Sequence, residues 1–431
     1  MISDNIAINK SGNLTFAGLD TVELAKKYAT PLYLLDEGKI REKCRIYKKA
    51  MRESFGEDSL PLYAGKALCI KDIYRIMREE EMGIDVVSSG EVFTASEGGF
   101  PMERAYFHGN NKTDVDVAFA IDRGIGYFVC DNEEELFAIE KEAAKRGIKQ
   151  KILIRLSPGI DPHTHKAIST GSVDSKFGVA IETGQADELI KLALEQEHIA
   201  LMGFHCHIGS QIFESEPFCR AAEIMIKYAA HVKETLGFTA SEINLGGGMA
   251  VRYLEEHPEI DYASNIAEIA AKMRQTCEEC FFPFPSVRME PGRSIVADAG
   301  MTLYSAGTVK VIPGFKSYLS IDGGMPDNPR YALYGSPYTV EIANKMNEKR
   351  DFVCTLAGRC CESGDIIQEN VSLPRPERGD VVAVLTTGAY NHSMASNYNR
   401  IPRPPVVMIA DGEDKMILRR ETFEDMLACE V

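Results

Sequence analysis

The sequence lacks three features, and each absence argues against a class of protein. It has no basic excess, because 48 lysines and arginines stand against 64 aspartates and glutamates, which gives a formal net charge of −16. So acidic a surface repels phosphate backbones and anionic lipids, which argues against nucleic-acid and membrane binding. No apolar run approaches the roughly 20 residues of a membrane-spanning helix. Internal repeats and low-complexity segments are absent too, so we expect a globular protein.

The cysteines do not form a recognisable framework either. Their number, eleven, is odd and their spacing irregular, unlike a set of disulfides in a secreted protein. Cys277 and Cys280 have the spacing of a zinc-binding pair but no second ligand pair nearby, so no metal is expected. Residues 1–13 include Asp4 and Lys10 and lack the apolar core of a signal peptide. We therefore expect a cytoplasmic protein.

At 431 residues the chain suits two or three domains of about 150 residues, or one barrel with an addition. Between residues 60 and 295, short β-rich runs alternate with amphipathic stretches of helical spacing, such as 132–147 and 217–236. This alternation predicts a parallel sheet, and its eight runs favour a (β/α)8 barrel over residues 36–298. A doubly wound open sheet fits the same pattern, because periodicity does not reveal closure. The eight runs are Leu62–Ala64, Ile84–Val87, Ala105–His108, Tyr127–Cys130, Lys151–Leu156, Leu201–His205, Glu242–Leu245 and Val287–Glu290.

The remaining residues, 1–35 and 299–431, have a different texture. β-Branched runs bounded by glycine, proline and aspartate follow one another without long helices, which predicts a mostly antiparallel β domain. Leu14–Phe16 and Pro31–Leu35 are expected to add strands, and Glu341–Lys349 to form one short helix. The other expected strands are Leu303–Val311, Tyr318–Ile321, Phe352–Leu356 and Val381–Leu385.

Polar residues follow the predicted barrel strands, at the end where barrel active sites form. His205 and His207 share one side of a strand, but without a carboxylate partner a structural role is favoured over a metal site. The turn Gly246–Gly248 suits either a phosphate cradle or a tight turn. With Lys66 as an amine, these groups suit pyridoxal phosphate, which offers an anion, a ring and a carbonyl carbon.

Six motifs in order carry a resemblance to a known family. The chain resembles the fold-type III pyridoxal-phosphate decarboxylases over roughly residues 30–410. The motifs are Tyr63-Ala64-Gly65-Lys66-Ala67, His207-Ile208-Gly209-Ser210-Gln211, Gly246-Gly247-Gly248, Glu290-Pro291-Gly292-Arg293, Cys361-Glu362-Ser363-Gly364-Asp365 and Gly388-Ala389-Tyr390.

For the cofactor, the resemblance implies a Schiff base on Lys66, a ring stacked on His207 and a ring nitrogen facing Glu290. A carboxylate there keeps that nitrogen protonated, which favours decarboxylation over the racemisation of relatives that have a cationic partner. Arg155 is a candidate support for Glu290. The remaining cofactor-pocket residues implied are Asp85, His108, Ser210, Gly247, Gly248, Gly292, Arg293 and Tyr390.

For the substrate, the resemblance is closest to members that convert meso-2,6-diaminopimelate into L-lysine and carbon dioxide, the last step of lysine biosynthesis. It implies that Cys361 returns a proton to Cα, and that Glu362 binds the distal ammonium group. It also implies a head-to-tail homodimer in which the Cys361-Glu362 loop reaches the partner's barrel. The remaining substrate residues implied are Arg293, Arg330, Tyr334 and Tyr390.

Three departures from the family pattern lie on the substrate side. They are Tyr331 in place of a proline, Cys360 in place of a histidine, and Asn391-His392 after Tyr390. They leave open a related decarboxylase acting on another amino acid or on a carrier-bound glutamyl group. A catalytically silent binding relative is disfavoured, because Lys66 and Cys361 are both present.

Overall fold

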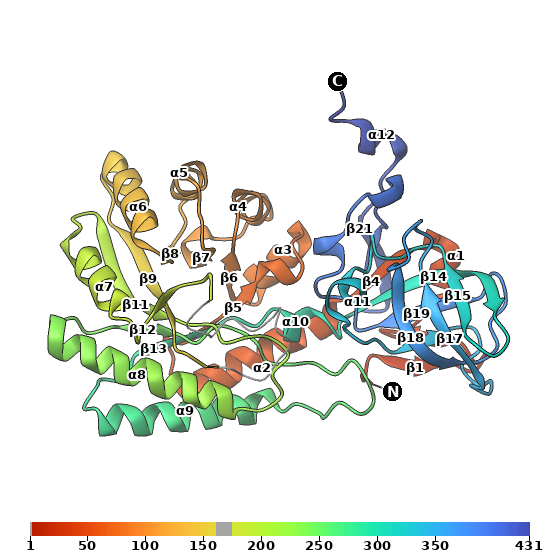
Figure 1. Cartoon of the computed structure of the whole chain (residues 1–431), viewed down its shortest axis with the longest axis horizontal. Coiled ribbons are helices and arrows are strands. Elements are labelled where there is room, and N and C mark those ends of the chain that lie inside the picture. Colours follow the sequence, from red (N-terminus) through yellow and green to blue (C-terminus); the bar gives the residue numbers. More distant parts are fainter. Residues whose placement is uncertain (1, 161–174) are drawn as a thin grey trace. The chain divides into compact units, whose positions relative to one another are not determined.

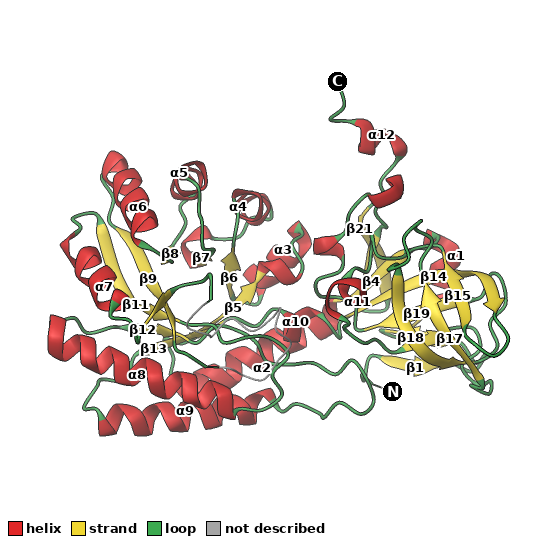
Figure 2. Ribbon diagram, in the orientation of Figure 1, coloured by secondary structure: helices red, strands yellow, loops and turns green. Residues whose placement is uncertain are grey.

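The computed structural model describes residues 2–160 and 175–431, which form two compact units. Unit 2 comprises Lys43–Ala250 and Ile260–Gly292. Unit 1 comprises Met1–Glu42, Val251–Glu259 and Arg293–Val431, so segment 251–259 groups with the β-rich part of the chain. Figure 2 shows long helices in unit 2 and mostly strands in unit 1.

Unit 2 is a closed barrel of parallel strands (Figure 1). The order β5-β6-β7-β8-β9-β11-β12-β13 returns to β5 through pairing of Arg288 with Leu60 and of Met289 with Pro61. The predicted barrel is therefore confirmed, and the open-sheet alternative is wrong. The strands are β5 (Leu60–Ala64), β6 (Gly83–Val86), β7 (Ala105–Phe107), β8 (Tyr127–Cys130), β9 (Gln150–Ser157), β11 (Ile199–His205), β12 (Glu242–Asn244) and β13 (Ser286–Met289), with a short β10 (Val179–Ala180) beside β9.

The barrel helices begin and end at residues with clear local reasons. In α6, the Asn132 side chain accepts a 2.9 Å hydrogen bond from the Glu135 amide and so caps the first turn. The helix ends at Gly147, whose left-handed conformation (φ 62°) favours glycine. The helices are α2 (Glu37–Phe55), α3 (Lys71–Glu79), α4 (Ser89–Glu97), α5 (Asp114–Asp122), α6 (Glu133–Arg146), α7 (Gln185–Glu195), α8 (Glu216–Leu236) and α9 (Tyr262–Glu279).

Unit 1 is built on a mostly antiparallel sheet of order β18-β17-β15-β14-β4-β20-β21, with β19 pairing β14 and β16. The predicted strand at Pro31–Leu35 is β4, which lies between β14 and β20. Leu14–Phe16 is β2, in a separate three-stranded sheet whose residues share the buried core of this unit. The elements are β1 (Ile6–Ile8), β2 (Leu14–Phe16), β3 (Leu19–Asp20), α1 (Thr21–Tyr28), β4 (Leu32–Asp36), α10 (Arg293–Val296), β14 (Gly300–Val311), β15 (Ser317–Ile321), α11 (Arg330–Tyr334), β16 (Val340–Ile342), β17 (Phe352–Ala357), β18 (Ile366–Leu373), β19 (Val381–Leu385), β20 (Val406–Ala410), β21 (Glu413–Leu418) and α12 (Phe423–Leu427).

The helix predicted at Glu341–Lys349 is wrong. Val340–Ile342 forms β16 and pairs antiparallel with β19, and the residues after it form turns. Asn344 then bonds the Asp380 carboxylate at 2.8 Å, which holds this turn to the start of β19. The pairing with a strand some 40 residues later overrides the local helical spacing.

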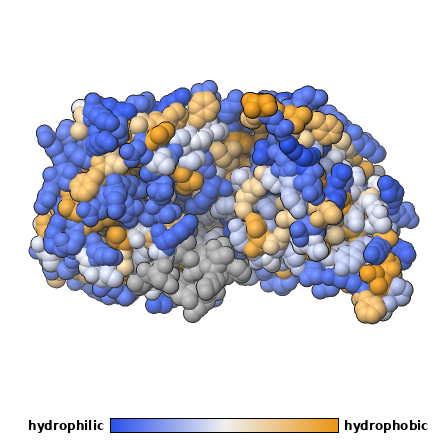
Figure 3. Space-filling view, turned by 45° about the horizontal axis from the view of Figure 1, so that its top comes forward, coloured by the Kyte–Doolittle hydropathy of each residue, from blue (hydrophilic) through white to orange (hydrophobic). Residues whose placement is uncertain are grey.

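Hydrophilic side chains dominate the face drawn in Figure 3, and hydrophobic ones form small groups, in keeping with the acidic composition. Within the part of the chain that the structure describes, every helix is too short or too polar to cross a membrane.

Candidate functional site

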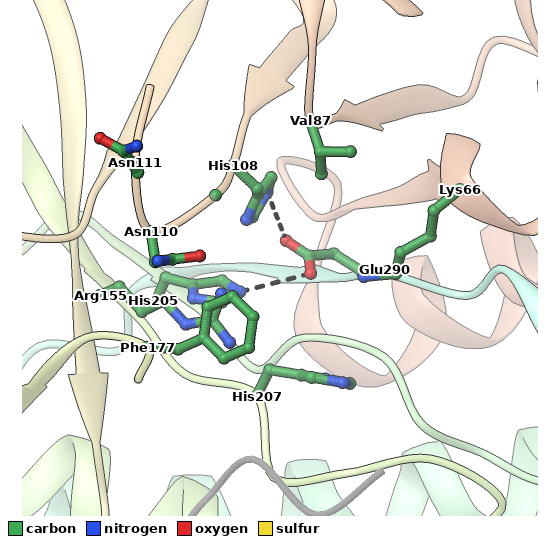
Figure 4. A pocket seen from close by; sticks show the side chains of 11 residues that line it. Lys66, Val87, His108, Asn110, Asn111, Arg155, Phe177, His205, His207 and Glu290 are labelled. Carbon is green, nitrogen blue, oxygen red and sulfur yellow. Dashed lines mark hydrogen bonds and ion pairs between the residues drawn. The ribbon is translucent and has the colours of Figure 1, made fainter. Parts of the chain in front are cut away.

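A cavity of about 410 Å³ in unit 2 brings together residues that are far apart in the sequence. Five predicted site residues line it, and each lies within or shortly after a different barrel strand (Figure 4). Because parallel barrel strands all end at one rim, side chains from position 66 to position 290 converge there. These five are Lys66, His108, Arg155, His207 and Glu290.

Lys66 lies in a 3-10 turn, Gly65–Ala67, directly after β5. Its Nζ is 3.6 Å from Oδ2 of Asp85, which is buried on β6. A Cβ at Gly65 would lie 2.6 Å from the Tyr74 hydroxyl and 2.9 Å from the Asp85 carbonyl oxygen, so only glycine lets this turn approach β6 closely. The turn thus delivers a primary amine to the rim, beside a carboxylate.

Glu290 follows β13 and is surrounded by hydrogen-bond donors. Asn244 Nδ2 donates to Glu290 Oε1 at 2.7 Å, and His205 Nε2 lies 3.3 Å from Oε2. His108 Nε2 is 3.0 Å from Oε1. Burial alone would raise the pKa of Glu290, but its interactions with His108 and His205 outweigh burial and hold that pKa well below its usual range. Glu290 is therefore an ionised carboxylate near neutral pH.

His207 and Arg155 occupy other parts of the same cavity. Burial lowers the pKa of His207 well below its usual value, so its flat ring is neutral near neutral pH and suited to stacking on an aromatic group. The Arg155 guanidinium lies 4.4 Å from the Phe177 ring centroid, and its Nε is 3.9 Å from Asp131 Oδ1. Burial lowers the pKa of Arg155 despite the nearby carboxylates. The contacts of Glu290 thus come from the histidines and Asn244, while Arg155 faces Asp131 and Phe177.

The turn Gly246–Gly248 after β12 is packed too closely for side chains. A Cβ would lie 2.0 Å from the Glu290 carbonyl oxygen at Gly247, and 2.3 Å from that of Gly209 at Gly248. Among the described residues, no protein acceptor takes the amide of Gly247 or Gly248. Backbone amides of a glycine turn that have no protein acceptor are what an anion such as phosphate requires. Two other residues were predicted to contact the phosphate. Ser210 lies in the segment that follows the carboxyl end of β11, and Gly292 packs so closely that a Cβ there would lie 2.8 Å from Ala64 Cβ.

In unit 1, two buried arginines meet around one phenol. Arg293 Nη1 donates to the Tyr253 hydroxyl at 2.9 Å, and the Arg330 guanidinium lies 4.8 Å from the Tyr253 ring centroid. Arg330 also donates to the Tyr338 hydroxyl at 3.0 Å. The ring centroid of Tyr390 lies 4.8 Å from the Arg293 guanidinium. This gathering of positive charge suits a carboxylate ligand.

The loop with Cys361 and Glu362 is exposed in unit 1, between β17 and β18. The Cys361 amide donates to Asn399 Oδ1 at 2.9 Å, which fixes the backbone while the thiol-bearing residue stays accessible. Tyr334, the last residue of α11, is partly buried.

The cavity also contains a group of side chains that could hold a metal ion. One donor atom each from His108, His205 and Glu290 lies within 4.8 Å of the others. The pair His205 and His207 weighed from the sequence does not form such a group, since the His205 ring contacts Glu290 and the His207 ring lies apart from it (Figure 4).

Sequence reasoning missed Asn244 and treated His205 only as a metal candidate. Both are the last residues of their strands and are register partners on neighbouring parallel strands, so both reach the rim. Each stands two residues before a recognised motif, at the end of a predicted strand, and that position was the available signal.

Comparison with known proteins places the chain among decarboxylases. Residues 37–297 match the pyridoxal-binding domain of the pyridoxal-dependent decarboxylases. The chain is 42% identical to a diaminopimelate decarboxylase of Bacillus subtilis, covering 97% of this chain and 95% of the relative. It is 43% identical to that of Halalkalibacterium halodurans with the same coverage. A crystal structure of diaminopimelate decarboxylase from M. jannaschii in complex with L-lysine superposes with a TM-score of 0.92 at 33% identity, covering 99% of this chain and 98% of that one.

Proposed function

This chain belongs to the pyridoxal-dependent decarboxylases, and on that premise we propose that it converts meso-2,6-diaminopimelate into L-lysine and carbon dioxide at the D-centre. The observation that carries the chemistry is one barrel cavity that holds an amine, Lys66, and an ionised carboxylate, Glu290. The choice of substrate rests on relatives of that name over nearly the full chain.

Pyridoxal phosphate fits the donor set of unit 2. When bound, it supplies an aldehyde for amines and a ring that accepts the electron pair released with carbon dioxide. Lys66 provides the amine for the aldehyde carbon, and Glu290 holds a proton on the ring nitrogen. His207 offers a neutral ring for stacking, and the amides of Gly247 and Gly248 bind the phosphate. Asp85, His108, Arg155, Ser210 and Gly292 complete the proposed pocket in unit 2. The resemblance adds Arg293 and Tyr390, which belong to unit 1.

The distal end of the substrate has a carboxylate and an ammonium group, which need opposite charges. Arg293 and Arg330, joined through Tyr253, suit the carboxylate. Glu362 suits the ammonium group, and Tyr334 and Tyr390 complete the proposed set. Breaking a buried charge pair at Arg330 with alanine should weaken substrate binding by about 2–5 kcal/mol.

After carbon dioxide leaves, Cα needs a proton, and we assign its delivery to the Cys361 thiol. Cys361 and Glu362 are exposed in the chain, which supports the further proposal that they act in the barrel of a second copy. The protein would then be a homodimer with shared sites. A cytoplasmic location stays a prediction from the sequence.

Mixing two inactive variants tests the shared site. If Lys66→Ala and Cys361→Ala chains exchange, half of the dimers are mixed and each carries one intact site, so about a quarter of wild-type turnover should return. Sites built within a single chain would give no recovery, although each variant alone keeps its fold by circular dichroism.

A substrate panel tests the reaction itself. Carbon dioxide release is measured with meso-diaminopimelate, lysine, ornithine and arginine, and the configuration of the product is determined. We expect turnover with the first and L-lysine as the product. Turnover confined to another of the four would replace the proposed substrate, and no release from any would contradict the function.

A further inference from the structure

The surroundings of Glu290 contain three polar side chains, none of which the resemblance places against it. His205 and Asn244 end β11 and β12 and pair in register, and His108 directly follows β7. Each is almost fully buried. Figure 4 shows the contacts of His108 and His205 with the carboxylate on the side facing away from Lys66. Three separate strands thus converge on one carboxylate.

The protons on this cluster can be assigned from chemistry. Burial lowers the pKa of His205 to about 4, so its ring is neutral near neutral pH and has a single N–H. An ionised carboxylate only accepts hydrogen bonds, so that proton lies on Nε2, 3.3 Å from Glu290 Oε2. His205 Nδ1 then has no hydrogen, and it has no partner among the described residues.

Asn244 connects the carboxylate to the glycine turn. Its amide nitrogen donates to Glu290 Oε1 at 2.7 Å, while its Oδ1 accepts the Gly246 amide at 2.9 Å. The Glu290 backbone amide in turn donates to the Gly246 carbonyl at 2.8 Å. Hydrogen bonds through Asn244 and Gly246 therefore join Glu290 to the turn whose Gly247 and Gly248 amides are proposed to bind the phosphate.

A count of acceptor sites shows that the carboxylate can accept a further hydrogen bond. Each carboxylate oxygen has about two lone-pair directions. Oε1 accepts one hydrogen bond, from Asn244 at 2.7 Å, and Oε2 accepts one, from His205 at 3.3 Å, while His108 Nε2 lies 3.0 Å from Oε1 without making a hydrogen bond. Among the described residues the carboxylate therefore keeps acceptor directions for a further N–H donor.

We propose that His205 and Asn244, with His108, are positioning residues that hold Glu290 ionised and keep its carboxylate directed at the ring nitrogen. This inference rests on the proposed function, because it concerns how this chain keeps that nitrogen protonated. It gives His205 and His207, two residues apart, different tasks: one orients the acid, and the other packs against the ring.

The test measures the ring nitrogen directly. Protein is loaded with pyridoxal phosphate labelled with ¹⁵N in the ring, and the ¹⁵N chemical shift is recorded near neutral pH. We expect a protonated nitrogen in wild type and in His205→Gln, which retains a donor, and a shift towards unprotonated pyridine in His205→Leu. The same leucine variant should lose about tenfold or more in kcat while KM changes about twofold or less.

His198→Leu is the matched control, because His198 precedes the same strand at its other end and contacts Glu140 at 2.8 Å. We expect it to behave as wild type. Asn244→Asp is a second variant in case His205→Leu does not fold. It keeps the acceptor for Gly246 but sets a negative charge against Oε1, so a proton should move from the ring nitrogen to the paired carboxyls.

Two results would overturn this inference without touching the proposed function. One is a fully protonated ring nitrogen in both His205→Leu and Asn244→Asp, when each variant is folded and loaded with cofactor. The other is a stoichiometric metal ion in the wild-type protein that is lost in His205→Leu. Wild-type protein that fails to bind the cofactor would instead overturn the proposed function, and this inference with it.

Discussion

The Asp365 carboxylate accepts a 2.7 Å hydrogen bond from the backbone amide of Cys360, the residue before Cys361. Its other oxygen accepts the Met325 amide at 2.6 Å, so one buried side chain joins two loops of unit 1. A Cβ at Gly358 would lie 2.2 Å from this carboxylate, which explains a glycine there.

Asp365→Asn should therefore loosen the Cys361 loop. The amide group keeps one acceptor and turns a donor towards the other backbone N–H, which should cost about 1–3 kcal/mol in the free energy of unfolding. Denaturant titration measures that change, and turnover should fall with it. Ser363→Ala, at an exposed position of the same loop, is the control and should stay within about 0.5 kcal/mol. An unchanged Asp365→Asn protein would show that the loop is held elsewhere.

Lys66→Ala should abolish both turnover and the visible absorbance band that the cofactor gives when joined to an amine. No other amine lines the cavity among the described residues, so nothing nearby replaces it. Absorbance after incubation with pyridoxal phosphate checks the expectation. Lys71→Ala, an exposed lysine at the start of α3, should keep both properties. A normal band in Lys66→Ala would refute the Schiff-base role.

The stability of unit 1 should depend on Asp327. Burial raises the pKa of this carboxyl to about 7, although hydrogen bonds from Tyr304 and the Gly324 amide partly oppose the shift. The folded state therefore binds a proton that the unfolded state has already released, and stability falls as pH rises from about 4 to 7, by up to about 4 kcal/mol.

Asp327→Asn removes this titration, so its stability relative to wild type should increase over the same pH range. The difference between the two unfolding midpoints, measured at several pH values, tests this. Parallel profiles for the two proteins would mean that Asp327 does not titrate there.

Tyr253→Phe should weaken substrate binding while leaving the cofactor band intact. The substitution removes the hydroxyl that accepts the 2.9 Å hydrogen bond from Arg293 but keeps the ring that contacts Arg330. We expect a loss of about 1–2 kcal/mol in the free energy of substrate binding, measured as a rise in KM. Tyr262→Phe, which loses a hydroxyl bonded to the Ala250 carbonyl, controls for the loss of a buried phenol. Equal KM values for the two variants would show that the Tyr253–Arg293 bond has no part in binding.

Much of the barrel, and several residues that line its cavity, could be predicted because their signals are local. Alternating strands and helices appear as two periodicities along the chain, and Lys66, His207 and the glycine turn lie in short motifs at strand ends. The wrong helix at Glu341–Lys349 had an equally local pattern, yet pairing with β19 made its first residues a strand.

The sequence by itself determined the order of strands, the acidic surface and the residue types at each strand end, since these depend on neighbours a few positions apart. Only the tertiary structure decided that β13 closes on β5 and that Glu290 meets His108, His205 and Asn244. Those contacts join residues 46 to 228 positions apart, and no local periodicity encodes a distance between strands that close a ring.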